Sequence, residues 1–268
     1  MMEEEFLMKK HISILLSTVF IIGSIFPVQA ATPKKISDDF LEPLVESGLY
    51  KVDNVEVISP SKEEITLLNE SDEPVAIEVE KSEGVKIYTF AEKDVVTEVK
   101  IAGDKVYLNG EPVTVSVKTE VFDSSVVSRA TSENWISDIK PFDSGKYGTK
   151  AAFVKDINIK ANQTIGALSL TALLALVSSP VASGLATLVA DIGTFSELKD
   201  ALEALQKKAP DTKGLYQRET YYKSSQEDTS GRPITYYYKV KLQYAKTQEF
   251  KKFYPESAYF YRKQMIYA

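Results

Sequence analysis

Apolar and polar residues alternate with a period of two in the first half of the chain, and this pattern predicts β-strands. In one run Val75, Ile77 and Val79 alternate with glutamates, and similar runs occur at residues 85–89, 95–101 and 113–121. The Asn109-Gly110 pair, which is favoured in two-residue hairpins, lies just before the last of these runs. The pattern therefore predicts an antiparallel meander with one apolar face and one face in water.

An uncharged segment follows, from Ala161 to Ala190. A Ser-Ser-Pro sequence ending at Pro180 interrupts it, so we expect two helices, at about residues 163–179 and 181–192, in a hairpin or a kinked rod. Neither helix has a charged face, a pattern found both in protein cores and in lipid, and the sequence leaves both interpretations open. In the membrane interpretation, the residues expected to contact lipid are Leu170, Leu173, Leu174, Leu176, Val177, Pro180, Val181, Leu185, Leu188 and Ile192.

An amphipathic helix and a second β-region complete the pattern. Thr194 and Glu197 have the spacing of a capping box, and the apolar positions after them predict a helix that ends before Pro210. Further along, strands are expected at residues 216–223 and 234–244. The sequence therefore predicts an α+β fold with an N-terminal antiparallel β meander, a central apolar helical hairpin plus an amphipathic helix, and a C-terminal Tyr-rich antiparallel β-region.

Composition and charge divide the chain into regions. The 268 residues are 44% hydrophobic, which is typical of a folded protein. Residues 31–140 carry a net charge of −11, whereas residues 209–268 carry a net charge of +5 and hold eleven of the fifteen tyrosines. We therefore expect a signal peptide at residues 1–30, an acidic β-rich region at 31–140, a linker and apolar helical region at 141–208, and a basic Tyr-rich β-region at 209–268.

The N-terminal residues have the features of a secretory signal peptide. Lys9 and Lys10 precede an apolar run of fifteen residues, Ile12 to Phe26, and small residues predict cleavage between Ala30 and Ala31. The run is shorter than the roughly 20 residues that a membrane-spanning helix needs, so a membrane anchor is the less favoured interpretation. We expect a secreted mature chain, and the lack of cysteine favours a Gram-positive secretion route.

Several classes of chemistry are excluded. Cleavage after residue 30 removes His11, the only histidine, and the chain contains no cysteine. These facts exclude Ser-His-Asp and Cys-His catalysis, His-ligated zinc and thiolate metal sites from the mature chain. No glycine-rich phosphate loop occurs, and a pI near 5.1 with only four arginines in the mature chain disfavours nucleic-acid binding. We expect no cofactor, no metal, no nucleotide and no nucleic acid.

Aromatic residues and lysines interleave in the C-terminal region. Aromatic rings and lysines together suit a bacterial envelope, where rings lie at headgroup level and ammonium groups meet anionic lipid or wall polymer. Tyrosine as a half-buried strand former is the structural alternative. The residues expected to bind the envelope are Tyr237, Lys239, Lys241, Lys251 and Lys252.

The order of the regions along the chain is similar to that of a known class of secreted proteins. A signal peptide, an acidic β-rich region, a linker containing Trp135, the uncharged segment at residues 164–192 and a Tyr- and Lys-rich C-terminal region follow one another. This arrangement resembles the large, heat-labile secreted bacteriocins of spore-forming bacilli, of the high-molecular-weight geobacillin kind. The resemblance covers the whole chain as an arrangement and a length. It implies antibacterial activity against related Gram-positive cells, and it carries over no catalytic residue.

We therefore expect a secreted, non-catalytic antibacterial protein whose partner is the membrane or envelope of the target cell. The sequence leaves open whether it oligomerises on the membrane. Two alternatives stay open. One is a secreted wall- or surface-binding protein without toxicity, and the other is a wall hydrolase that uses two carboxylates. The abundant Asp and Glu residues do not form a recognisable catalytic pattern, which is why the hydrolase is the least favoured of the three.

Overall fold

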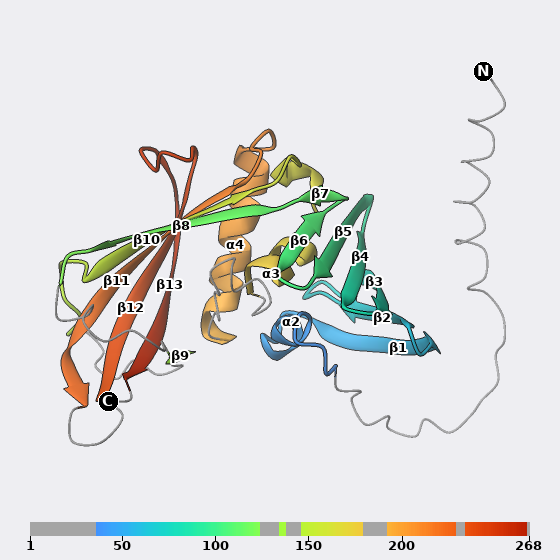
Figure 1. Cartoon of the computed structure of the whole chain (residues 1–268), viewed down its shortest axis with the longest axis horizontal. Coiled ribbons are helices and arrows are strands. Elements are labelled where there is room, and N and C mark those ends of the chain that lie inside the picture. The colour runs from blue at the N-terminus through green and yellow to red at the C-terminus, as the bar shows by residue number, and fades with distance from the viewer. Residues whose placement is uncertain (1–35, 124–133, 138–145, 179–191, 229–233, 267–268) are drawn as a thin grey trace. The chain divides into compact units, whose positions relative to one another are not determined.

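Two antiparallel sheets and a few helices make up the chain in the computed structural model (Figure 1). The structure describes residues 36–123, 134–137, 146–178, 192–228 and 234–266. Within these ranges, strands β1 to β7 form one sheet in sequence order, and the other sheet has the order β8-β10-β11-β12-β13-β9. The predicted α+β fold, with an N-terminal meander and C-terminal antiparallel strands, is confirmed.

The N-terminal sheet is a continuous meander. Its strands are β1 (Lys51–Ser59), β2 (Lys62–Leu68), β3 (Pro74–Ser82), β4 (Val85–Glu92), β5 (Val95–Ala102), β6 (Lys105–Leu108) and β7 (Glu111–Pro112). Asn109 and Gly110 connect the last two strands with φ angles of 47° and 80°, the left-handed values that a type I′ hairpin turn requires. As predicted, Val75, Ile77 and Val79 on β3 are buried, so one face of the meander forms a core.

Two short helices contribute to that core. Helix α2 (Glu42–Glu46) contacts α3 (Leu170–Ser178), and α3 in turn contacts β4 and β5. Helix α3 is shorter than the helix predicted at residues 163–179. A 3₁₀ turn, η2 (Ile165–Ala167), and an extended Leu168 take the place of its first turns. The second expected helix, at 181–192, lies outside the described residues except for its last residue.

The C-terminal sheet contains longer strands. They are β8 (Thr114–Val121), β9 (Asn134–Ser137), β10 (Phe153–Lys160), β11 (Leu215–Asp228), β12 (Ile234–Ala245) and β13 (Phe253–Ile266). The alternating run at 113–121 forms β8 from Thr114 onward, and this strand pairs with β10 and not with the meander. Val113 N still donates to Val106 O on β6 at 2.9 Å, and beyond this residue the chain passes on to the second sheet, where β8 pairs with β10.

Helix α4 (Ile192–Lys208) contacts both α3 and β13. Its apolar residues Leu198, Leu202 and Leu205 are buried, as the predicted amphipathic pattern requires. The helix begins two residues before Thr194, so the predicted capping-box threonine lies inside the helix and does not cap it. Among the described helices, none combines the length and the hydropathy needed to cross a membrane.

Candidate functional site: the Tyr–Lys face

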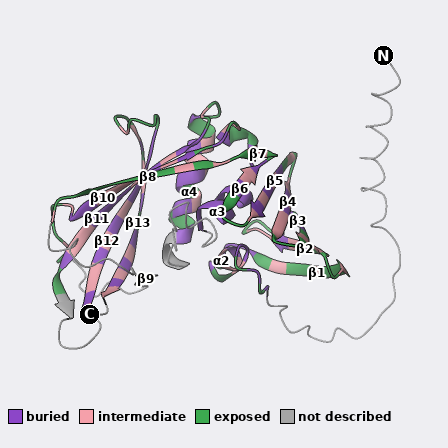
Figure 2. Cartoon of the chain, viewed as in Figure 1, coloured by how far each residue is buried: buried purple, intermediate pink, exposed green. Residues whose placement is uncertain are grey.

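One face of the C-terminal sheet is buried and the other is half-exposed (Figure 2). On β12 the even-numbered residues from Tyr238 to Tyr244 are buried, whereas Lys239 and Lys241 on the opposite face are partly accessible. We call this accessible surface the Tyr–Lys face. It consists of Tyr222 on β11, Tyr237, Lys239 and Lys241 on β12, and Tyr259 and Tyr261 on β13.

The strand register brings tyrosines and lysines together in rows. Tyr222 lies opposite Lys239, and Lys239 lies opposite Tyr261 on the next strand. Lys241 likewise lies opposite Tyr259. Side chains directly opposite each other in a sheet have Cβ atoms about 5 Å apart, so each lysine in these rows is flanked by an aromatic ring.

A shallow pocket of about 270 Å³ opens on this face. The Lys239 Nζ atom lies 4.7 Å from the centroid of the Tyr259 ring, a cation–π distance. Tyr147 reaches the pocket from the linker because its backbone bridges to Ser224, and its ring lies 5.5 Å from that of Tyr261. The pocket is lined by Tyr147, Gly148, Tyr222, Lys239, Tyr259 and Tyr261.

The pocket presents aromatic faces, phenol hydroxyls and one ammonium group. Partial burial, and secondarily Tyr259, raises the pKa of the Tyr222 phenol, which therefore keeps its proton and can donate a hydrogen bond at neutral pH. Aromatic rings offer apolar area to the CH groups of a ligand, and an ammonium group attracts an anion such as phosphate. An anionic, hydroxyl-rich ligand fits this combination better than an apolar one.

The structure gathers some of the predicted envelope-binding residues and separates others. Tyr237, Lys239 and Lys241 share the Tyr–Lys face. Lys251 and Lys252 are exposed in the turn between β12 and β13. Since Lys239 lies six residues before the end of β12, this turn is roughly 20 Å from it along the strand.

The sequence analysis singled out only Lys239 among the residues that line the pocket, and it missed Tyr147, Gly148, Tyr222, Tyr259 and Tyr261. Tyr222 lies in an expected strand, but only the register with β12 shows that it faces Lys239. Tyr147 lies in the linker, and no sequence pattern places it against Tyr261.

The residues expected to contact lipid have a different environment. In α3, Leu173, Leu174, Leu176 and Val177 are between 0% and 3% exposed, and Leu170 is half-buried against the same core. Ile192 is the first residue of α4. Outside the described residues are Pro180, Val181, Leu185, Leu188 and the expected cleavage residues Ala30 and Ala31.

Hydrogen bonds hold the N-terminus of α3 against the meander. The Glu92 Oε2 atom accepts hydrogen bonds from Ser169 Oγ at 2.8 Å, from Thr171 Oγ1 at 2.8 Å and from Thr171 N at 3.1 Å. A carboxylate at this position also interacts favourably with the positive end of the helix dipole. The hydroxyls of Tyr50 and Thr171 are 3.1 Å apart and add a further bond. Glu92 therefore has a structural role as the cap of α3.

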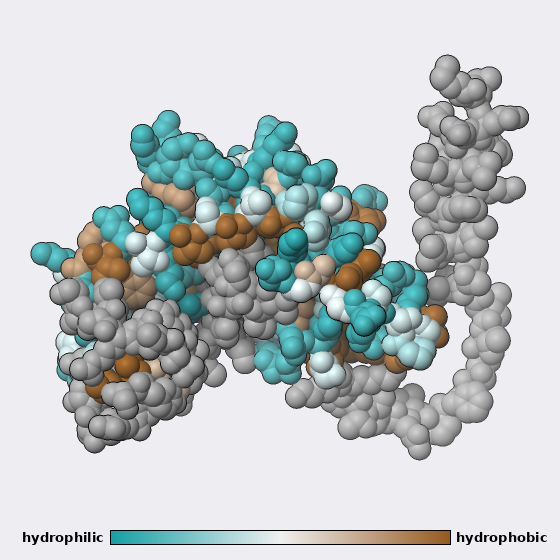
Figure 3. Space-filling view, in the orientation of Figure 1, coloured by the Kyte–Doolittle hydropathy of each residue, from teal (hydrophilic) through white to brown (hydrophobic). Residues whose placement is uncertain are grey.

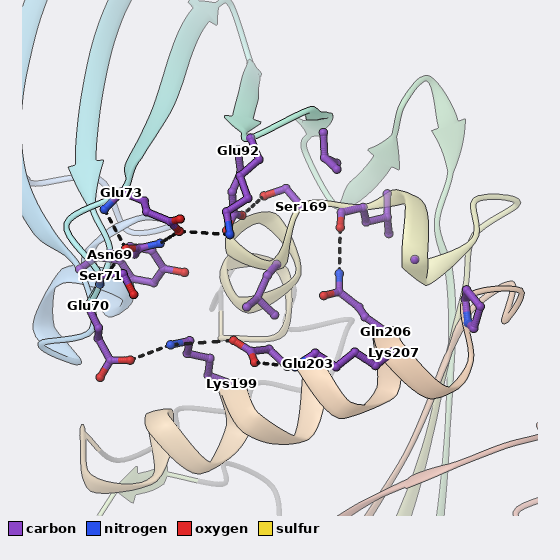
Figure 4. Close-up of a pocket in the computed structure, with 17 residues that line it drawn as sticks. Asn69, Glu70, Ser71, Glu73, Glu92, Ser169, Lys199, Glu203, Gln206 and Lys207 are labelled. Atoms are coloured by element: carbon purple, nitrogen blue, oxygen red, sulfur yellow. Dashed lines mark hydrogen bonds and ion pairs between the residues drawn. The ribbon is translucent and has the colours of Figure 1, made fainter.

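A larger pocket, of about 520 Å³, lies beside this junction (Figure 4). Two of its carboxylates are engaged with cations: Glu70 lies 2.6 Å from Lys199 Nζ, and Glu203 lies between Lys199 and Lys207 at 3.9 and 3.6 Å. A third, Glu92, accepts the hydrogen bonds that cap α3. A hydrogen bond from Asn69, followed by Lys93, lowers the pKa of Glu73.

A catalytic acid needs the opposite shift, toward a raised pKa. The Glu73 carboxylate is ionised at neutral pH and is a poor proton donor. Glu73 is therefore not suited to the role of the proton-donating carboxylate of a hydrolase. Within the described residues, no group of three or more Asp, Glu, His or Cys is arranged to hold a metal ion.

Comparison with protein-family models, with curated proteins and with solved structures finds no match for this chain.

Proposed function

We propose that this protein is exported and acts, without catalysis, as an antibacterial protein that binds the envelope of Gram-positive cells through the Tyr–Lys face. The observation that supports the proposal is the open pocket in which Lys239 lies over the Tyr259 ring beside Tyr222 and Tyr261. Wall polymers of Gram-positive cells combine sugar rings with anionic groups. Aromatic rings can stack on the sugars while the ammonium group meets the anion.

The burial of α3 constrains any membrane step in this proposal. Exposing Leu173, Leu174, Leu176 and Val177 to water would cost roughly 1.5 to 3 kcal/mol for each side chain. The sum is comparable with the whole stability of a typical domain, about 5 to 15 kcal/mol. Release of α3 therefore requires lipid to replace the protein core at the moment of release. We place envelope binding first and membrane disturbance second.

Growth inhibition by the purified mature chain, measured on a panel of bacilli, tests the proposal. We expect the wild-type chain to inhibit growth and a Lys239→Gln, Tyr259→Ser double variant to inhibit much less at equal concentration. Loss of the ammonium group and of the ring should remove binding and leave the fold intact, since both side chains are accessible. Equal inhibition by the two proteins would contradict the role of this face.

Dye release from anionic liposomes tests the second step separately. Leakage caused by the wild-type chain supports membrane disturbance. Growth inhibition without leakage would restrict the action to the wall. If the chain binds purified wall saturably and inhibits no strain, the function is that of the non-toxic wall-binding protein, which the same pocket also supports.

A further inference from the structure

Strand β8 forms an open edge of the C-terminal sheet. It pairs with β10 on one side only, and all its residues except Val115 are exposed. Val117 is 46% exposed and Val121 is 39% exposed, although both lie on the same face as the buried Phe153 and Ile157 of β10. Figure 3 shows apolar side chains in a band that follows the course of this strand. An edge with unpaired backbone groups and exposed valines is a template for another strand.

The other sheet edges in the described parts of the chain are short, irregular or partly covered. β13 pairs with β9 only from Arg262 to Met265, and farther along this edge Tyr259 N donates to the Glu197 carboxylate of α4 at 3.3 Å. β1 also exposes apolar residues, but its register with β2 is irregular between Val52 and Asn54 and again between Val57 and Ser59. Such irregularities bend an edge strand and hinder pairing. The strands β7 and β9 have two and four residues. In contrast, β8 pairs with β10 over eight residues without a register shift.

The backbone direction of β8 follows from one hydrogen bond. Phe122 N donates to Ala152 O at 2.8 Å, so the N–H of residue 122 points toward β10. N–H groups alternate in direction along a strand. The N–H and C=O groups of Val117, Thr119 and Val121 therefore point away from the sheet and are available to a second strand.

We propose that β8 pairs antiparallel with β8 of a second copy of this chain, about a two-fold axis at Thr119. This register uses only outward-pointing residues as hydrogen-bonded pairs: Thr119 with Thr119, and Val117 with Val121. It also places Lys118 of each copy directly opposite Glu120 of the other, as a non-hydrogen-bonded pair, in which side chains approach closely. Each dimer then has two opposite-charge pairs on one face and two valine pairs on the other.

Charge selects this register over its neighbours. An axis at residue 118 would place Lys118 opposite Lys118, and an axis at residue 120 would place Glu120 opposite Glu120. Like charges directly opposite each other destabilise a strand pair. Within the described residues neither side chain lies within 4 Å of an opposite charge in the same chain, although Lys118 lies opposite Asp156 on β10 and Glu120 contributes to the raised pKa of Arg218.

Sedimentation equilibrium of the mature chain tests the proposal, with Lys118→Glu and Glu120→Lys as single variants. We expect the wild type to dimerise in the micromolar range and each single variant to dimerise roughly tenfold more weakly, or worse, because each carries two like-charge pairs. An equimolar mixture of the two variants should recover dimerisation, since every Glu then meets a Lys. Thermal melting of each variant verifies that it is folded.

The matched control is Lys105→Glu, the same charge change at an exposed position of β6. It should leave the dimer unchanged. A wild-type chain that stays monomeric over the whole range overturns the proposal. So does a dimer that neither single variant weakens, or a mixture that fails to recover, because either result places the contact elsewhere or in another register. Wall binding through the Tyr–Lys face is measured separately and does not depend on these outcomes.

Discussion

The two sheets use their buried faces differently. In the N-terminal meander the buried face is almost entirely apolar, with Leu67, Val75 and Phe90 fully buried. In the C-terminal sheet the buried face also contains Glu219 and Arg262, 1% and 5% exposed. Burial of charged and amide groups is costly unless they are hydrogen-bonded. Beside the meander this holds for Asp38, which is 7% exposed and accepts hydrogen bonds from the Tyr88 hydroxyl and from Lys86, whereas the second sheet carries buried charged groups on its own strands.

Hydrogen bonds connect the polar groups of the second core. Glu219 accepts a hydrogen bond from the Tyr221 hydroxyl at 2.5 Å and from Gln217 Nε2 at 3.2 Å, and Arg262 donates to the Tyr221 hydroxyl at 3.1 Å. The opposite face of the same strands carries the Tyr–Lys pocket. The strands of the meander thus follow the usual pattern of an apolar buried face and a polar exposed face. The strands of the C-terminal sheet depart from this pattern, as functional regions of proteins commonly do.

The largest expected effect is a loss of stability in the core that α3 shares with the meander. Leu174 on α3 is fully buried, and Leu174→Ala should lower the free energy of unfolding by about 3 kcal/mol, through lost burial and the cavity left behind. Urea denaturation measures this change. The control, Val96→Ala on β5, removes a side chain that is 61% exposed and should change stability by less than about 0.5 kcal/mol. Similar values for the two variants would show that α3 is not core.

The next effect concerns the polar core of the C-terminal sheet. Arg262→Met removes a buried cation that donates to the Tyr221 hydroxyl, which in turn donates to Glu219. It should destabilise the chain by about 2 kcal/mol, because the hydrogen-bonded chain that ends at the buried Glu219 carboxylate loses its cation. Lys263→Met, on the neighbouring residue and the other face, is the control for the charge change. Urea denaturation gives the free energy of unfolding of both variants. An Arg262→Met chain as stable as the wild type would show that the hydrogen-bond network does not stabilise the fold.

A smaller effect isolates the charge of the Tyr–Lys face. Lys239→Gln should weaken binding to purified wall roughly threefold at low salt, and the difference should shrink as salt screens the ammonium group. Lys100→Gln is a matched control, since Lys100 also lies over a tyrosine ring, that of Tyr107, at 5.6 Å on the meander. An equal loss in both variants would indicate binding through total charge and not through this face.

The smallest effect is a pH dependence in the meander. The pKa of Glu73 is lowered below its ordinary value of 4.5 by the hydrogen bond from Asn69 and by Lys93. A lowered pKa in the folded state contributes stability that is present above the unfolded-state pKa and is lost as the pH falls through the folded-state pKa. Glu73→Gln should remove a small part of the acid dependence of unfolding below about pH 4.5 and change little at pH 7. An unchanged acid profile would contradict the shift.

The sequence allowed the meander to be predicted because its determinants are local. The alternation around Val75 and Ile77 and the turn at Asn109 and Gly110 specify strands and connections between neighbours in sequence. The outcome for β8 was less predictable. Its alternation defines a strand equally well in either sheet, and only the long-range pairing with β10 decides between them.

The candidate site could be predicted only in part, for the same reason. The pattern around Lys239 and Lys241 shows that they share a face, because residues two apart on a strand do so. The approach of Tyr147 and Tyr222 depends on contacts across strands and with the linker, which no local pattern contains. Apolar periodicity likewise could not distinguish a core position for Leu174 from a position in lipid, since both environments select the same side chains.

Equilibrium binding to purified Gram-positive wall by a Tyr259→Ser variant tests the central claim most directly, with Tyr107→Ser on the meander as its matched control. Tyr259 is 38% exposed and lies under Lys239, so its loss should leave stability nearly unchanged and weaken binding about tenfold. Tyr107→Ser should bind like the wild type. Unchanged binding by Tyr259→Ser, or an equal loss in both variants, would contradict the account.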